Sequence, residues 1–91
     1  MERFKAGDIV RHFKKETIDN GDPNVYTYKV LCVTAREVDN YERVVVYESL
    51  YDLGDVKRGD VFVRRYDEFV SLVDTEKYPN ISQLYRFEKL F

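Results

Sequence analysis

The sequence predicts a mainly β fold: a small, strongly bent antiparallel sheet, arranged as an SH3-like barrel or half-barrel, with a short C-terminal helix. Three observations predict this class. Short runs of β-branched, aromatic and apolar residues alternate with turns that contain glycine. One of these runs, Arg43–Tyr51, is largely apolar on both side-chain parities, which is typical of a strand inside a sheet. A helix-capping pattern follows near the C-terminus.

Five strands are expected, and the run Arg43–Tyr51 is expected to be the central one. The first strand follows a turn at Gly7, and a polar loop over residues 14–24 leads into the second. Asp67 and Glu68 predict a single helical turn between the fourth and fifth strands. The expected ranges are Ile9–Phe13, Val25–Thr34, Arg43–Tyr51, Val61–Arg65 and Phe69–Val73, the last as a short strand or a strand-like segment.

The C-terminal region predicts a short helix that packs on the sheet. Asn80 is a helix-capping residue, and Gln83 stands at the third helical position after it. The residues with helical spacing are Ile81, Leu84, Tyr85 and Glu88. Burying an apolar stripe of this kind stabilises a small domain substantially, so the region is expected to belong to the fold.

Composition narrows the classes of protein. Ninety-one residues predict one domain over residues 1–91, and a net charge of −2 with interspersed signs makes nucleic acid an unlikely partner. No run of ~18 apolar residues predicts a membrane span, and the first residues lack an apolar signal core, so a cytoplasmic location is expected. Cys32 is the only cysteine, which excludes an internal disulfide and a cysteine-based zinc site. Its place on the charge-free row Tyr26, Tyr28, Val30, Cys32 predicts a buried, reduced thiol.

Six stretches of the chain resemble DUF1653, a bacterial family of small proteins of unknown function. They are GDIVRHFK at 7–14, KET at 15–17, YKVL at 28–31, VVVYESLYD at 44–52, VFVRRYDEF at 61–69 and SLVDTEKYPNISQLYRFEKL at 71–90. The resemblance implies a small β-rich domain with an SH3-like architecture and no established activity. The chain departs from the family's usual pattern at Arg36–Asp39 and at Arg64-Arg65.

The candidate binding surface lies on the third and fourth strands. If Tyr51 pairs with Val61 across the turn 52–60, Glu48 faces Arg64, flanked by the pairs Leu50–Phe62 and Val46–Tyr66. Lys29 of the second strand is expected on the same side. This Lys–Glu–Arg cluster is either an ion pair that stabilises the sheet or a polar anchor inside an apolar binding surface. The candidate ligand-binding residues are Lys29, Glu48, Arg64, His12, Phe62 and Tyr66.

The first functional hypothesis is a non-enzymatic binding module for a protein segment or a small polar ligand. One alternative is a small enzyme that uses His12, the only histidine, with a strand carboxylate; another is a nucleic-acid-associated domain. No motif for a catalytic residue, cofactor or metal is present. The paired basic residues, among them Lys14-Lys15 and Arg64-Arg65, are interpreted as solvated surface because acidic residues lie near them in sequence. The sequence leaves the partner and the oligomeric state open.

Overall fold

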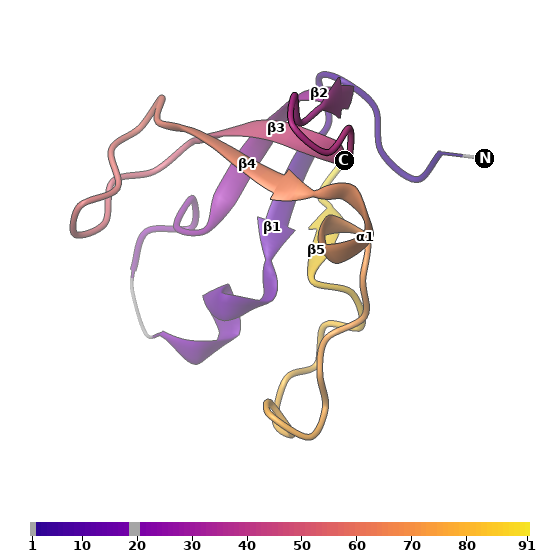
Figure 1. Ribbon diagram of the computed structural model, residues 1–91. Helices are drawn as coiled ribbons and strands as arrows, with labels where there is room; N and C mark the ends of the chain where they lie inside the picture. Colours follow the sequence, from indigo (N-terminus) through magenta and orange to yellow (C-terminus); the bar gives the residue numbers. More distant parts are fainter. Residues whose placement is uncertain (1, 19–20) are drawn as a thin grey trace.

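The protein is built on a five-stranded antiparallel sheet in the order β4-β3-β2-β1-β5 (Figure 1). It is seen in a computed structural model that describes residues 2–18 and 21–91. The bounds are β1 Ile9–His12, the 3₁₀ helix η1 Phe13–Thr17, β2 Thr27–Arg36, β3 Arg43–Ser49, β4 Val61–Arg65, the helix α1 Tyr66–Phe69 and β5 Phe87–Lys89. In this part of the chain no helix is long and apolar enough to cross a membrane.

The mainly β class is confirmed, but the sheet is open. β4 and β5 lie at its two edges and do not pair with each other, so the SH3-like barrel is not confirmed. The sheet is nevertheless curled, because Arg64 on β4 lies 5.5 Å from the ring of Phe87 on β5. β3, expected at the centre, is paired on both sides as predicted, yet β2 occupies the middle position.

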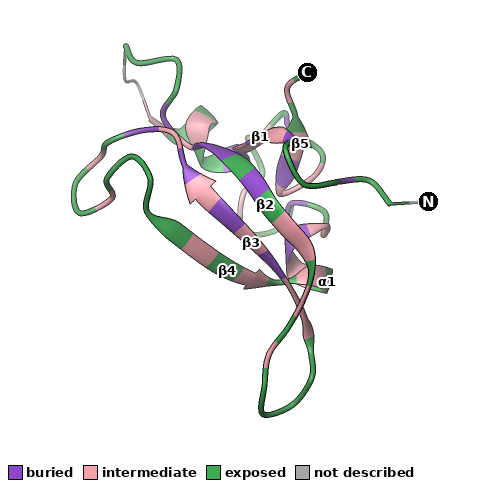
Figure 2. Ribbon diagram, turned by 90° about the horizontal axis from the view of Figure 1, so that it is seen from above, coloured by how far each residue is buried: buried purple, intermediate pink, exposed green. Residues whose placement is uncertain are grey.

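Aromatic residues make up much of the buried core on the inner face of the sheet. Figure 2 shows buried positions alternating with less buried ones along β3. The rings of Phe69 and Phe87 stack with their centroids 4.0 Å apart, and Phe4 meets Phe69 edge-on at 5.2 Å. Deeper in the face, the hydroxyl groups of Tyr28 and Tyr51 form a buried hydrogen bond of 2.7 Å. Elements from both ends of the chain therefore close one shared core.

The predicted C-terminal helix is wrong, because residues 80–86 are irregular and lead into β5. Glu16 of η1 explains the difference: its carboxylate accepts hydrogen bonds from the backbone N–H groups of Ser82 and Gln83, both at 2.8 Å. These N–H groups are of the kind that the first turn of a helix leaves without a partner. The tail does belong to the fold, through Phe87 and not through the predicted stripe, in which Leu84 is 61% exposed.

A regular fifth strand over Phe69–Val73 is wrong, although Leu72 forms an isolated antiparallel bridge with Tyr85. The expected helical turn at Asp67-Glu68 is confirmed as part of α1, and it includes Phe69. The residues after it run alongside the C-terminal segment: Val73 donates to the Leu84 carbonyl and Arg86 to the Ser71 carbonyl, both at 2.9 Å. The strand that completes the sheet is β5, which pairs with β1.

The predicted burial of Cys32 is wrong as well, since its side chain is half-buried. Val30 pairs with Tyr47 on the inner face, but a register shift follows, and Cys32 pairs with Val46 on the outer face. A bulge of this kind re-aims the side chains beyond it. A hydrogen bond with the Thr34 hydroxyl, 3.6 Å away, lowers the pKa of the Cys32 thiol.

Candidate functional site

The predicted Lys–Glu–Arg cluster is wrong because the β3–β4 hairpin is three residues out of the expected register. Glu48 pairs with Val61, and Arg64 pairs with Val45. An odd shift moves a side chain to the other face of a sheet, so Glu48 and Arg64 lie on opposite faces. Lys29 pairs with Glu48, so these two residues lie on the same side of the sheet, as expected.

The turn between the two strands accounts for the shift. Leu53 and Val56 form a two-way backbone hydrogen-bonded pair around Gly54, which has a φ of 57°. Gly59, with a φ of 94°, then donates to the Ser49 carbonyl, and Ser49 donates to the Asp60 carbonyl. Part of the turn thus forms a small hairpin of its own, and Asp60 becomes the first partner of β3.

Two surfaces result, and the first is the outer face of β3 and β4. Val44, Val46, Val61 and Val63 all lie on this face, and Val61 and Val63 are 58% and 65% exposed. The Lys29–Glu48 pair borders this apolar row on the β2 side. Contiguous apolar surface of this kind commonly marks an interaction site.

The backbone of β4 adds an open edge to this outer face. The Asp60 carbonyl accepts from β3, so by the alternation of antiparallel strands the even-numbered residues of β4 direct their N–H and C=O groups to β3. Val61, Val63 and Arg65 direct theirs away from it. β4 has no second neighbour among the strands that the structure describes, so these groups remain available to an added strand.

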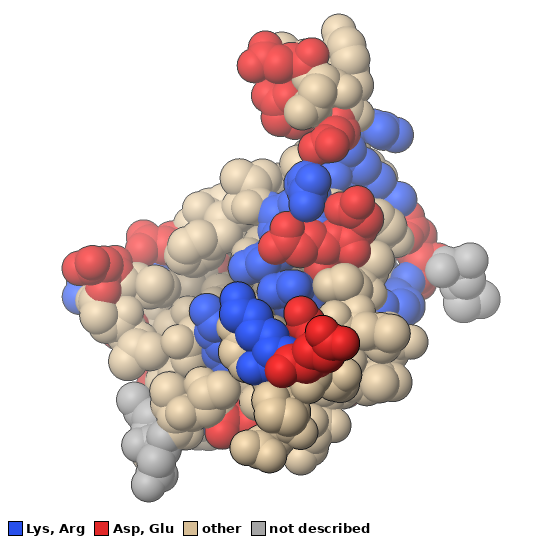
Figure 3. All heavy atoms as spheres, turned by 60° about the horizontal axis from the view of Figure 1, so that its bottom comes forward, with Lys and Arg blue, Asp and Glu red and all other residues tan. Residues whose placement is uncertain are grey.

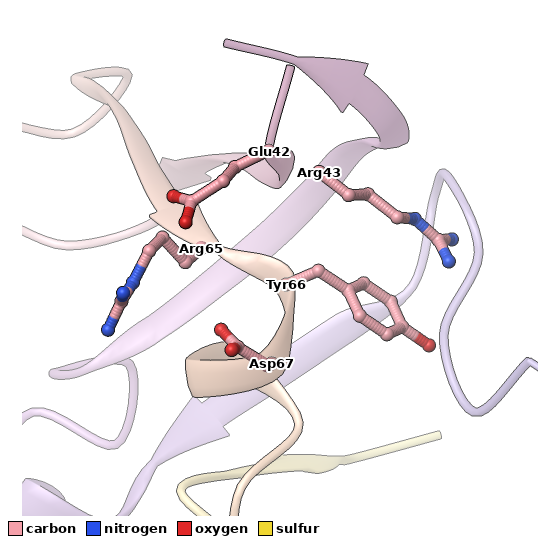
Figure 4. Close-up of a pocket in the computed structure, with 5 residues that line it drawn as sticks. All are labelled: Glu42, Arg43, Arg65, Tyr66 and Asp67. Atoms are coloured by element: carbon pink, nitrogen blue, oxygen red, sulfur yellow. The ribbon is translucent and has the colours of Figure 1, made fainter. Parts of the chain in front are cut away.

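A cavity of about 220 Å³ lies where β4 ends (Figure 4). Arg43, the first residue of β3, donates to the Val33 carbonyl at 2.6 Å and stacks on the ring of Tyr66 at 3.8 Å. The Glu2 carboxylate pairs with Arg43 and accepts from the Tyr66 hydroxyl at 2.6 Å, and these hydrogen bonds, from Tyr66 foremost, lower the pKa of Glu2. The residues that line the cavity are Glu42, Arg43, Arg65, Tyr66 and Asp67.

The second surface is the rim of the inner face, where the structure brings His12 and Arg64 together. The Nδ1 atom of His12 accepts a hydrogen bond of 3.0 Å from the backbone N–H of Lys14. Burial, followed by the charges of Arg64, Arg86 and Lys14, lowers the pKa of His12 to about 3. No carboxylate is among these neighbours, so the arrangement lends no support to an enzyme that couples His12 to a strand carboxylate.

Arg64 is held by contacts with β3 and α1. Its Nε donates to the Tyr47 hydroxyl at 3.1 Å, and its Nη1 lies 2.7 Å from the Glu68 carboxylate. Phe62 lies on the same inner face, opposite Tyr47. Figure 3 shows Lys and Arg side chains gathered in a band on one side of the molecule, with Asp and Glu beside them.

Sequence reasoning missed Arg86, Arg43 and Glu68 as members of these surfaces. Arg86 falls within the predicted C-terminal helix, and no local pattern indicates that the tail returns to β1. Lys14 belongs to a basic pair in the sequence, but the other charges that act on His12 with it come from β4 and the tail.

The described residues contain no group of three or more His, Cys, Asp or Glu side chains that could hold a metal ion.

Comparison with known proteins identifies the family to which the chain belongs, but it identifies no ligand. No curated protein and no solved structure matches the chain. The family model described as a protein of unknown function, DUF1653, matches residues 8–89, nearly the whole length, and the chain therefore belongs to this family.

Proposed function

We propose that the protein is a binding module that takes an extended protein segment as an added strand along β4. One observation carries the proposal. β4 is an edge strand, and its two valines on the outer face, Val61 and Val63, are both more than half exposed. Strand addition uses both parts of such an edge: backbone hydrogen bonds supply affinity, and alternate side chains supply specificity.

The side chains of β4 indicate which residues the added segment should carry. Residues of the segment opposite Val61 and Val63 lie on the apolar outer face, so apolar, β-branched or aromatic side chains suit these positions. The segment is extended, with alternate apolar residues. Neither Val61 nor Val63 carries a charge, so a charged side chain opposite either of them would lose hydration without gaining a partner.

A second copy of the chain is a less suitable occupant than a segment. β4 has five residues, whereas a stable protein–protein interface buries roughly 800 Å² on each partner. An edge of this length pairs well with a short strand but contributes only part of that area. A segment, in contrast, gains most of its affinity from the backbone hydrogen bonds themselves.

The test begins with peptides selected from a random phage-displayed library against the native protein. Val63→Pro removes an outward N–H group and leaves the β3–β4 ladder intact, because proline is tolerated on the open side of an edge strand. Val63→Thr is the matched control, since it keeps the N–H and the β-branched shape. We expect Val63→Pro to lose binding while Val63→Thr retains most of it.

Amide hydrogen exchange identifies the bound edge directly. On peptide addition, the N–H groups of Val61, Val63 and Arg65 should become protected from exchange. Selected peptides that bind Val63→Pro as tightly as Val63→Thr would contradict the proposal. A concentration-dependent dimer that Val63→Pro abolishes would assign the edge to a second copy and would also overturn it.

A further inference from the structure

Three basic side chains from distant parts of the chain surround His12 on the rim of the inner face. Lys14 comes from η1, Arg64 from β4 and Arg86 from the segment before β5. Each of the three lowers the pKa of His12 by its charge. Topology, and not sequence proximity, assembles this group, which we call the basic rim.

Aromatic rings form the floor of the basic rim. The Phe13 and Phe87 rings lie 4.5 Å and 4.9 Å from the His12 imidazole. The Arg86 guanidinium lies 6.0 Å from the Phe13 ring, and the Arg64 guanidinium lies 5.5 Å from the Phe87 ring. An apolar floor lowers the local dielectric constant, which strengthens the attraction of the cations for an anion placed above it.

The basic rim has more positive than negative charge. Arg64 is paired with Glu68, which also lies 3.6 Å from Arg65. Arg86 donates to the neutral hydroxyl of Ser71 at 3.3 Å. Within the described residues, the side chains of Arg86 and Lys14 form no ion pair. The charges of Lys14 and Arg86 are therefore not neutralised by a carboxylate. The carboxylate that pairs with Arg64, that of Glu68, also lies near Arg65.

His12 supplies an independent observation. Its Nδ1 accepts the Lys14 N–H, so the neutral imidazole carries its proton on Nε2. This N–H group has no oxygen or nitrogen acceptor in the part of the chain that the structure describes, and it is not one of the fully buried polar atoms, although only 5% of the residue is exposed. A donor without a protein acceptor, placed among cations, suits an oxygen-bearing anion as its partner.

We propose that Lys14, Arg64 and Arg86, together with the Nε2–H group of His12, form a binding site for an oxyanion group, either the phosphate or the carboxylate of a small ligand. The two arginines match the geometry of such groups, and Lys14 contributes a mobile charge at the exposed side. This site is on the opposite face of the sheet from the apolar row of β3 and β4, so the proposal stands independently of strand addition.

The test is a titration of the full chain with inorganic phosphate, and in a second arm with acetate, at constant ionic strength set by chloride. His12 is the only histidine, so its ring resonances report the site without ambiguity. We expect a saturable shift of the His12 ring and of the Nε groups of Arg64 and Arg86 at pH 7. The anion that saturates at the lower concentration identifies the group as phosphate or carboxylate.

Variants distinguish a site from general screening. Arg86→Gln should weaken binding at least tenfold, Arg86→Lys should restore part of it, and Lys57→Gln in the β3–β4 turn should change nothing. Lys14→Gln, which removes an exposed side chain without a described contact, should weaken binding several-fold and keeps the test decisive if Arg86→Gln does not fold. Shifts that rise linearly with anion concentration, or equal affinity in Lys14→Gln and Lys57→Gln, would overturn the proposal.

Discussion

At the scale of the residue, His12 combines burial with a polar structural role. Its imidazole caps η1 by accepting the Lys14 N–H, and its ring packs against Phe13 and Phe87. The sequence places His12 in the first strand, but inside the predicted range Ile9–Phe13 and not at the end of β1. Its burial could not be read from the sequence, because Phe87 and Arg86 reach it from the other end of the chain.

His12 is expected to make the protein sensitive to acid. Its pKa is about 3 in the folded state and about 6.5 in an unfolded chain, so the unfolded state binds more protons between these values. The free energy of unfolding therefore falls as the pH drops below 6.5, by at most ~1.4 kcal/mol per pH unit from this group. Above pH 6.5 the residue adds no pH dependence.

Urea unfolding at a series of pH values measures this effect. His12→Asn keeps an acceptor for the Lys14 N–H and removes the titrating group. Between pH 6.5 and 5, above the range in which most carboxylates titrate, the variant should lose less stability than the native chain. An identical slope in the two proteins would show that His12 remains protonatable in the folded state.

At the scale of the element, local pattern was sufficient where a strand is bounded by its own turn. Residues 61–65 form β4 with the predicted bounds, because Asp60 ends the turn and Tyr66 begins α1. The register was not predictable from alternation alone. The turn with its Leu53–Val56 pair and Gly59 shifts the pairing of β3 with β4 by three residues from the expected one. The C-terminal segment failed for a different reason: the capping pattern at Asn80 is local, whereas Glu16, which replaces it, is 66 residues away from Ser82.

Glu16 is expected to hold the C-terminal segment against η1. Glu16→Ala removes the acceptor of two backbone N–H groups, so the amides of Ser82 and Gln83 should exchange with solvent faster. Glu76→Ala is the matched control, because Glu76 is exposed in the same segment and its side chain makes no described contact. Unchanged protection of Ser82 and Gln83 in Glu16→Ala would mean that other contacts fix the segment.

At the scale of the whole molecule, the two ends of the chain complete a core that the middle strands only begin. Phe4 and Phe87 are 5% and 0% exposed, and both contact Phe69. The sequence indicated that the tail takes part in the fold, but the residue that anchors it is Phe87 and not Leu84. The candidate site was less accessible to sequence reasoning, since Arg64, one of the three members of the predicted cluster, lies on the other face because of the change in register.

Phe87→Ala is expected to be among the most destabilising substitutions. A fully buried phenylalanine typically contributes about 3–5 kcal/mol to the free energy of unfolding, and Phe87 also stacks on Phe69. Phe91→Ala is the matched control, because Phe91 is 90% exposed and should change stability by less than about 0.5 kcal/mol. Equal denaturation midpoints for the two variants would contradict the central place of Phe87 in the core.

The reach of the N-terminal segment has a consequence for the order in which the protein acquires its structure. Arg3 donates to the carbonyl groups of Val70 and Phe87, 67 and 84 residues further along the chain. Synthesis proceeds from the N-terminus, so β1 emerges with one flank unpaired until residues 87–89 follow it. Contacts this distant in sequence slow folding. Phe4 and the open flank of β1 consequently stay exposed on the nascent chain until residues 87–89 have been synthesised.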